Sequence, residues 1–285
     1  MKKILITGAT SYIGKSFESY MKQFSTDYLI DTVSLRNNAW KKKDFSPYDV
    51  VFHVAGIAHV STDPKMADLY FKVNRDLTIE TAKKAKTDGV KQFIFMSSII
   101  VYGNSPGVEK VIDRNTMPDP SNFYGKSKLE AEEGLNLLAS EKFKIVTLRP
   151  PMIYGKGSKG NYPKLAKAAQ MLPIFPEIGN RRSMLHIDNL CEFIRKMIDN
   201  EESGIFFPQN AEYVETSKMV KLIAEAHGRE VRLVKVFNPA IRFMAGKIGI
   251  INRVFGSLVY EESMSLYKEN YRIRSFKESV RLTEK

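Results

Sequence analysis

Short apolar segments alternate with amphipathic segments through the first half of the chain. The longest amphipathic segment, 64–87, places Leu69, Val73, Leu77 and Ala82 close to the 3.6-residue period of a helix. Strands that alternate with helices predict a parallel sheet covered on both faces, and therefore an α/β fold. The pattern predicts strands over 2–7, 28–35, 49–55, 91–97 and 144–148, and helices over 12–24, 64–87 and 121–140.

The pattern changes after Pro150 and Pro151. Residues 150–183 are rich in proline and glycine, and we expect a loop-rich binding region there. Regular structure is predicted to resume near 184–187. It is followed by strands over 204–207 and 230–235, helices over 189–199 and 217–227, and a helical C-terminal region. We expect one nucleotide-binding domain over 1–150 and 181–210, and a smaller, partly interleaved substrate domain over 151–180 and 211–285.

Composition narrows the class of protein. The 285 residues are 43% apolar and 27% charged, which is typical of a globular protein. The formal net charge is 44 − 32 = +12, so an anionic partner is expected: nucleic acid, a membrane surface or a phosphorylated metabolite. Cys191 is the single cysteine, and the N-terminal apolar run ends at Gly8, too short for a secretion signal. These features predict a cytoplasmic protein.

Glycines mark the turn between the first strand and the first helix, in the segment Thr7-Gly8-Ala9-Thr10-Ser11-Tyr12-Ile13-Gly14. A nucleotide-binding α/β sheet binds the pyrophosphate of its cofactor at this turn, because the helix N-terminus offers N–H groups to phosphate. Gly8 would permit the tight turn, and Gly14 the close packing of helix on strand. The alternative is an ordinary glycine-containing turn, and the position at the start of a strand–helix–strand unit favours phosphate binding.

Arg36 lies at the end of the second strand, 36 − 14 = 22 residues after Gly14. At this place an acidic residue binds the ribose hydroxyls of NAD(H), whereas an arginine suits the 2′-phosphate of NADP(H). The sequence therefore favours NADP(H), with NAD(H) as the alternative. Asp44 and Phe45, just before the third strand, are expected to flank the adenine ring.

Tyr124 and Lys128 lie four residues apart, on one face of a predicted helix. A nearby ammonium favours the phenolate form of a tyrosine and lowers its pKa, so the pair is a proton-transfer unit. Ser98 follows the fourth strand, at the carboxyl edge of the sheet, where such folds bind ligands. A hydroxyl, a phenol and an ammonium are thus expected to converge beside the nicotinamide.

Taken in order, these motifs resemble the extended short-chain dehydrogenase/reductase superfamily, which includes nucleotide-sugar epimerases, dehydratases and reductases. The resemblance spans nearly the whole chain and implies a Rossmann-type doubly wound sheet. The matching residues are Thr7-Gly8 through Gly14, Asp44-Phe45, Ala55-Gly56-Ile57-Ala58-His59, Asn74, Ser97-Ser98, Val101-Tyr102-Gly103, Tyr124, Lys128, Leu148-Arg149-Pro150 and Tyr154-Gly155.

The resemblance implies that Ser98, Tyr124 and Lys128 are the catalytic triad, with Lys128 also holding the ribose. One position departs from the family, because Ser11 replaces the middle glycine of the phosphate turn; its hydroxyl is a candidate phosphate ligand. The predicted cofactor-binding residues are Gly8, Thr10, Ser11, Tyr12, Ile13, Gly14, Arg36, Asp44, Phe45, Ala55, Gly56, Tyr124, Lys128 and Pro151.

Two isoleucines, Ile99 and Ile100, follow Ser98, where the family's dehydratases carry an Asp-Glu pair. Isoleucine cannot transfer protons, so a 4,6-dehydratase is disfavoured. Two reactions remain open: NADPH-dependent reduction of the C4 ketone of a UDP-4-keto-6-deoxy-N-acetylhexosamine for surface polysaccharide, and NAD-dependent 4-epimerisation of a UDP-hexose or UDP-N-acetylhexosamine. Arg36 and similarity in segments such as 180–183 and 255–258 favour the reductase.

Ser98, Asn161 and Arg182 are the expected substrate-binding residues, since Asn161 and Arg182 match the family's UDP-binding positions. An arginine suits a diphosphate because it can bind two oxygens at once. The resemblance further implies a homodimer through the helices 64–87 and 121–140. The alternative from another class is a catalytically silent, NADP-sensing regulator on the same fold.

Other candidate partners are weaker. No nucleic-acid motif is present and the basic residues are scattered, so nucleic-acid binding is not expected. The four histidines, His53, His59, His186 and His227, lack metal-ligand spacing, and no metal is expected. Residues 239–258 mix apolar and basic positions; they are predicted to cover the substrate domain, with peripheral association at the inner membrane face as the alternative and no stable insertion.

Overall fold

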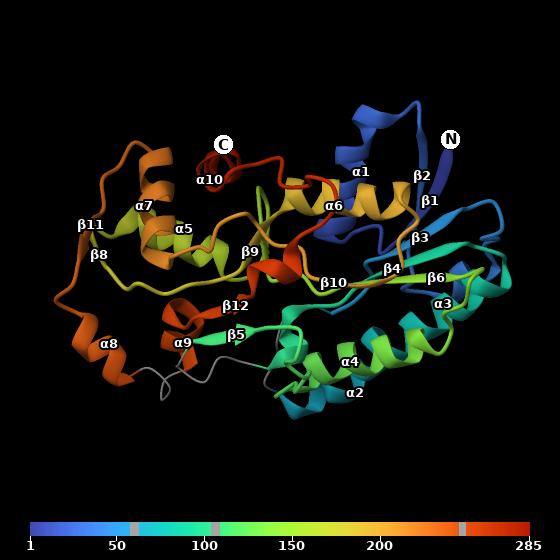
Figure 1. The fold of residues 1–285 in the computed structure, drawn as a ribbon, viewed down its shortest axis with the longest axis horizontal. Helices are drawn as coiled ribbons and strands as arrows, with labels where there is room; N and C mark the ends of the chain where they lie inside the picture. Colours follow the sequence, from blue (N-terminus) through green and yellow to red (C-terminus); the bar gives the residue numbers. More distant parts are fainter. Residues whose placement is uncertain (58–62, 104–108, 245–248) are drawn as a thin grey trace. The chain divides into compact units, whose positions relative to one another are not determined.

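The computed structural model describes residues 1–57, 63–103, 109–244 and 249–285, and the chain divides into two compact units (Figure 1). The first unit holds a six-stranded parallel sheet in the order β10-β6-β4-β3-β1-β2. This arrangement confirms the α/β, doubly wound fold class. The strands are β1 (Lys2–Thr7), β2 (Tyr28–Val33), β3 (Val50–His53), β4 (Gln92–Met96), β6 (Lys144–Leu148) and β10 (Gly204–Phe206).

Helices cover both faces of this sheet. In Figure 1, α1 (Tyr12–Met21) and α6 (Ile187–Asp199) lie on one side, and α2 (Ala67–Tyr70), α3 (Leu77–Thr87) and α4 (Phe123–Asn136) lie on the other. The central strands are buried on both faces, as their continuous apolar sequences require. The order of strands reverses between β1 and β3, and parallel α/β sheets bind ligands at such a switch point.

The predicted helix 64–87 is confirmed as helical, but it is not one regular helix. It begins as a 3₁₀ turn (Pro64–Met66), continues through α2, becomes a π-helix (Phe71–Asp76), and ends as α3. Insertions of π-helix are rare and occur often at functional sites. The π segment contains Asn74, which is fully buried.

The second unit comprises residues 104–116, 151–190 and 208–285. Three two-stranded parallel sheets and three longer helices surround its own core. The elements are β5 (Lys110–Ile112), β7 (Met152–Tyr154), α5 (Tyr162–Met171), β8 (Ile174–Pro176), β9 (Met184–His186), α7 (Thr216–Ala226), β11 (Arg232–Val234), α8 (Asn238–Met244), α9 (Gly249–Phe255), β12 (Leu258–Tyr260) and α10 (Phe276–Glu284).

Two expectations about this second unit need correction. The segment 150–183 is only about half loop, because it also contains β7, β8 and α5, whose first turn accommodates Pro163. The unit boundaries also differ from those expected, since 104–116 and 181–190 belong to the second unit. The reason is strand pairing: β5 pairs with β12, and β9 pairs with β7.

The segment 239–258 forms α8 and α9, apart from residues 245–248, which lie outside the described ranges. Val254 and Phe255 pack against the core of the second unit, which agrees with a covering role. No helix within the described part of the chain is both long enough and apolar enough to span a membrane.

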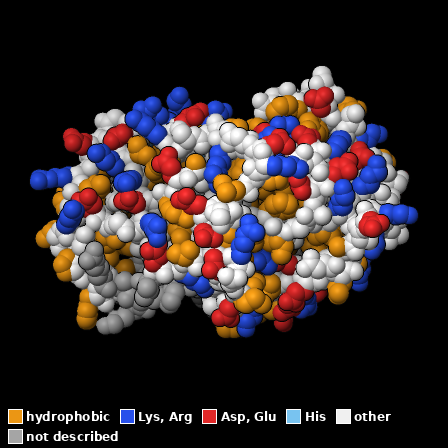
Figure 2. Space-filling view, viewed as in Figure 1, with side chains coloured by type: hydrophobic (Ala, Val, Ile, Leu, Met, Phe, Trp, Pro, Cys, Tyr) orange, Lys and Arg blue, Asp and Glu red, His pale blue; other side chains and the backbone are white. Residues whose placement is uncertain are grey.

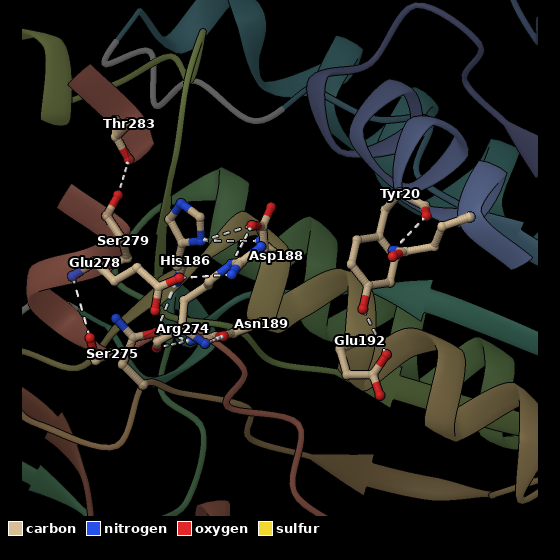
Figure 3. Close-up of polar contacts among 12 residues, drawn as sticks. Tyr20, His186, Asp188, Asn189, Glu192, Arg274, Ser275, Glu278, Ser279 and Thr283 are labelled. Carbon is tan, nitrogen blue, oxygen red and sulfur yellow. Dashed lines mark hydrogen bonds and ion pairs between the residues drawn. The ribbon is translucent and has the colours of Figure 1, made fainter. Parts of the chain in front are cut away.

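A polar network attaches the C-terminal helix to the second unit (Figure 3). Arg274 donates from Nε to Asp188 (3.0 Å) and from Nη1 to Glu278 (2.7 Å), while the Asp188 N–H donates to His186 Nδ1 (3.3 Å). Burial lowers the pKa of His186 to about 4, so the ring is a neutral acceptor in this network. The first unit has a separate contact of this kind, in which Tyr20 donates to Glu192 at 2.8 Å.

Candidate active site

The turn after β1 is shaped by Gly8, whose φ is +82°. A Cβ at Gly8 would lie 2.8 Å from the backbone nitrogen of Ala55, so a side chain there would push apart the ends of β1 and β3. This close approach at the switch point leaves the backbone exposed to a ligand, as a pyrophosphate site requires. The predicted residues Gly8 and Ala55 are therefore brought together, and both are half-buried.

Ser11 has a structural role that the sequence alone did not reveal. It is the N-cap of α1, and its Oγ accepts the N–H of Gly14 at 2.9 Å. A Cβ at Gly14 would lie only 2.7 Å from that Oγ, so the serine and the second glycine fit each other. The helix then opens with Tyr12 and Ile13, and its N-terminus keeps the partial positive charge that favours phosphate.

Arg36 lies beside this turn. Its Nη2 donates to Thr10 Oγ1 at 3.3 Å, and both side chains are exposed. The exposed Arg36 guanidinium thus lies beside the phosphate turn, just after the end of β2. An arginine at this place is able to bind a phosphate group through two of its N–H groups.

The structure does not support an adenine contact by the Phe45 ring. That ring is fully buried in the core of the first unit, with its centre 6.5 Å from that of the Trp40 ring. The backbone N–H of Phe45 donates to the Asp88 carboxylate. The neighbouring Asp44 is exposed, and its carboxylate accepts the N–H and the hydroxyl of Ser46, which lowers its pKa. Of these two side chains, the exposed Asp44 is therefore the one available to a ligand.

Tyr124 and Lys128 lie on the first two turns of α4, whose N-cap Asn122 accepts the N–H of Gly125. Both are buried: Tyr124 is 8% exposed and Lys128 is 5% exposed. Lys128 Nζ donates to the carbonyl of Met96 (2.8 Å) and lies 4.6 Å from the centre of the Phe95 ring. The lysine is thereby held at the carboxyl end of β4, where Ser98 follows.

Ser98 begins the 3₁₀ turn Ile99–Tyr102 and accepts the N–H of Ile100 at 3.3 Å. Burial raises the pKa of Tyr124 to about 12, and a hydrogen bond with Ser98 opposes this shift. The pKa shift is opposite to the one expected from Lys128, because the loss of water around the phenol outweighs the influence of its polar neighbours.

Burial also lowers the pKa of Lys128, to about 8, while the charge of Glu132 raises it in part. Tyr124 therefore holds its proton at neutral pH, and Lys128 titrates slightly above neutrality. Gly56 completes this side of the site: a Cβ there would lie 3.4 Å from Lys128 Nζ. His59 of the same loop lies outside the described residues.

The remaining predicted residues belong to the second unit. Arg182 is fixed by backbone hydrogen bonds with Val214 in both directions, 3.0 and 2.9 Å. Burial lowers the pKa of its guanidinium, so an anion placed against it would stabilise the charged form. Asn161 is exposed at the N-cap of α5, and Pro151 is buried just before β7.

The sequence model of the NAD dependent epimerase/dehydratase family matches residues 4–207, which is most of the chain. The chain belongs to this family. A UDP-glucose 4-epimerase of Vibrio cholerae is 30% identical over 90% of this chain and 86% of its own length. The expected superfamily is thereby confirmed.

Solved structures of other proteins share the fold. A UDP-glucuronic acid 4-epimerase from Bacillus cereus, in complex with NAD, is 17% identical with a TM-score of 0.72, covering 98% of this chain and 96% of that one. The enzyme RMD from Pseudomonas aeruginosa, complexed with NADPH, is 18% identical with a TM-score of 0.71, covering 99% and 98%. At these identities the likeness concerns the fold alone.

Asn74 belongs to the motifs that resemble the family, but the sequence alone indicates no role for it. Its Oδ1 accepts the N–H of Ile57 (2.8 Å), and its Nδ2 donates to the Ile57 carbonyl (3.1 Å) and to Ser127 Oγ (3.2 Å). Ser127 in turn donates to the carbonyl of Tyr124. Asn74 thus joins the loop after β3 to the helix of the family's Tyr-Lys pair, and the π segment places it there.

His53 is also buried near Lys128, but as a neutral ring between two hydroxyls. Its Nδ1 lies 2.9 Å from Thr7 Oγ1 and its Nε2 lies 3.0 Å from Thr78 Oγ1. Burial, with a smaller effect of the Lys128 charge, lowers its pKa to about 3. Across residues 1–57, 63–103, 109–244 and 249–285, no group of three or more His, Cys, Asp or Glu side chains could hold a metal ion.

Proposed function

We propose that this family member is an NADPH-dependent nucleotide-sugar reductase that acts on the C4 ketone of a UDP-4-keto-6-deoxy-N-acetylhexosamine. The observation that carries the choice of cofactor is the guanidinium of Arg36 beside Thr10 at the phosphate turn. Family membership and the similarity to a UDP-sugar epimerase support the substrate class. The product would serve surface polysaccharide synthesis in the cytoplasm.

A bound nicotinamide cofactor would supply the hydride for this reduction. Tyr124 holds the matching proton, because its raised pKa of about 12 keeps the phenol neutral at physiological pH. The phenol donates this proton to the carbonyl oxygen, and the Ser98 hydroxyl polarises the same oxygen by a hydrogen bond. Lys128 orients the ribose and supplies positive charge next to the phenolate that remains.

Asn161 and Arg182 are proposed to bind the UDP diphosphate. The guanidinium of Arg182 is destabilised by burial, and the diphosphate charge would offset that cost. The Arg182 backbone is fixed against Val214, so its stem is held in place before the substrate binds. Asn161 contributes an exposed amide at the N-terminus of α5.

A 4-epimerase is the second candidate, favoured by the 30% identity to the Vibrio cholerae epimerase. That reaction begins with oxidation, so Tyr124 would first have to accept a proton from the C4 hydroxyl. Reduction instead begins with a protonated phenol, which donates its proton to the oxygen of the C4 ketone. The two reactions therefore place opposite demands on the same residue.

The deciding experiment mixes the pure protein with NADPH and UDP-4-keto-6-deoxy-N-acetylglucosamine. We expect stoichiometric loss of nicotinamide absorbance and formation of the 4-hydroxy sugar. No consumption of NADPH, together with interconversion of UDP-GlcNAc and UDP-GalNAc in the presence of NAD⁺, would establish the epimerase instead. Arg36→Gln should lower the preference for NADPH over NADH roughly 10-fold or more by removing a charge-assisted phosphate contact, with Lys42→Gln as a matched exposed control.

A further inference from the structure

A buried ion pair lies next to the proton-transfer residues, and no role has been assigned to it so far. Glu132 follows Lys128 by one turn on α4, and its side chain is 2% exposed. Arg149 follows β6, and its side chain is 7% exposed. The guanidinium donates to both carboxylate oxygens: Nε lies 3.2 Å from Oε1 and 3.1 Å from Oε2, and Nη2 lies 2.5 Å from Oε2.

The pair extends to both ends of the turn that carries Ser98. Ser97, immediately before it, donates its hydroxyl to Glu132 Oε1. Tyr102, the last residue of the turn, accepts from Arg149 Nη1 at 2.7 Å, and its ring lies under the guanidinium. The turn is therefore held at its beginning and at its end by one ion pair, and that pair is attached to the helix of Tyr124 and Lys128.

The charge of Glu132 also faces Lys128. The groups around the lysine are Tyr124 and Glu132 on its own helix, the neutral ring of His53 on β3, and the Phe95 ring and Met96 carbonyl on β4. Glu132 is the carboxylate whose charge favours the ammonium form of Lys128. One side chain thus influences the position of Ser98 and the charge of Lys128 together.

We propose that Glu132 is a positioning residue for proton transfer, which through Ser97, Arg149 and Tyr102 holds the Ser98 turn against the helix of Tyr124 and Lys128. This inference rests on the role of those residues in the proposed function. Stability alone is a poor reason for the pair, because burying two charges costs about as much as their attraction returns. Apolar residues of similar volume would fill the same space.

The first test is Glu132→Gln, which keeps the size of the side chain and removes its charge. We expect kcat for ketone reduction to fall at least tenfold with little change in KM, since the substrate-binding residues are untouched. The pH midpoint of NADPH binding, measured by fluorescence, should move below that of the unsubstituted protein as Lys128 loses its charge partner. Glu133→Gln is the matched control, being the adjacent, exposed carboxylate on α4.

A double variant, Glu132→Leu with Arg149→Met, separates positioning from stability. If the pair only stabilises the fold, this apolar replacement should restore kcat; if it positions the turn, kcat stays at the level of Glu132→Gln in a folded protein. Ser97→Ala is a milder variant, which keeps the proposal testable if both Glu132 variants unfold. It removes only the hydroxyl that donates to Glu132, and we expect kcat to fall several-fold. Wild-type kcat and an unchanged midpoint in a folded variant would overturn the proposal.

The test of Glu132 does not require that the proposed keto sugar be the true substrate. If the unsubstituted protein fails to oxidise NADPH with the keto sugar, the proposed reductase is contradicted. The midpoint of NADPH binding and the rate of UDP-GlcNAc epimerisation then test Glu132 in the same set of variants. Failure of the positioning role and failure of the reductase are thus read from different measurements.

Discussion

The chemistry of the site depends on how the fold removes water from two titratable side chains. Burial raises the pKa of Tyr124 to about 12 and lowers that of Lys128 to about 8, because each charged form loses hydration. The sequence places the two residues one helical turn apart, which predicts that the Lys128 ammonium lowers the pKa of the Tyr124 phenol. The structure shows instead that desolvation dominates both, and that Ser98 and Glu132 modify the result.

Replacement of Tyr124 by Phe tests whether this phenol transfers the proton. We expect the rate of ketone reduction to fall by roughly 10²–10⁴-fold, the usual contribution of general acid catalysis. NADPH affinity should remain within a few-fold, since only the hydroxyl is removed. Tyr48→Phe, remote from Ser98 and bonded to Asp31, is the control. A protein that keeps its biological role without this hydroxyl would instead be the NADP-sensing regulator.

The pH dependence of the reaction follows from Lys128. Its folded pKa of about 8 means that Lys128 is nearly all ammonium below about pH 7, half ammonium near pH 8 and mostly neutral above about pH 9. Tyr124 stays protonated over this whole range. We therefore expect kcat/KM for NADPH to be level below about pH 7, to bend near pH 8 and to fall up to tenfold per pH unit above it. Steady-state kinetics from pH 6 to 10 check this, and a level profile up to pH 10 would contradict it.

At the scale of elements, the start of α1 illustrates how a departure from a family pattern is accommodated. Ser11 gives up the close backbone approach of a glycine but caps the helix through Gly14. The side chain and the following glycine are matched in space, with 2.7 Å between Ser11 Oγ and a Cβ built on Gly14. The serine thus stabilises the N-terminus of α1, while Gly8 still forms the tight turn after β1.

Ser11 can be tested by two substitutions. Ser11→Ala should lower the free energy of unfolding by about 1 kcal/mol, because the N–H of Gly14 loses its acceptor. Ser11→Gly should cost only a few tenths of a kcal/mol, since glycine is an acceptable N-cap. Urea denaturation measures both, with Ser16→Ala in the middle of the same helix as the control. Equal stability of the Ala and Gly variants would argue against the capping role.

At the scale of the whole molecule, the lysines and arginines that give the excess positive charge occupy several different places in the structure. On the face drawn in Figure 2, Lys and Arg side chains are interspersed with Asp and Glu, which does not favour nucleic-acid binding. Five lysines, Lys2, Lys86, Lys91, Lys142 and Lys144, line a cavity of about 710 Å³ at the amino edge of the main sheet. Lys2 and Lys86 donate to the carbonyls of Ile198 and Leu138, so part of the charge stabilises the C-terminal ends of α6 and α4.

The stability of the protein should also depend on His53. Its folded pKa of about 3 lies below the ordinary 6.5, so its contribution is complete above pH 6.5. As the pH falls from 6.5 towards 3, the unfolded state binds a proton that the folded state does not, and stability is lost by up to about 1.4 kcal/mol per pH unit. His186 has a shift of the same sign in the second unit.

Urea denaturation of the unsubstituted protein and of His53→Gln, at several pH values between 3 and 8, isolates this contribution. We expect the unsubstituted protein to lose stability more steeply on acidification, by a few kcal/mol over the range. Glutamine can still bond with Thr7 and Thr78, so the variant should fold. Parallel pH curves for the two proteins would show that His53 is protonated equally in both states.

The sequence by itself determined the sheet and its direction, and it provided the candidate site residues. Apolar runs alternating with amphipathic segments leave little choice but a parallel sheet, and the motif order places Gly8, Ser98 and Tyr124 at its carboxyl edge. The tertiary structure decided what depends on burial and on distant contacts: the Phe45 ring in the core, the π segment around Asn74, the grouping of 104–116 with the second unit, and the direction of the Tyr124 pKa shift. Such features depend on which groups lose water together, and residues far apart in the chain, such as Glu132 and Arg149, meet only when the sheet has formed.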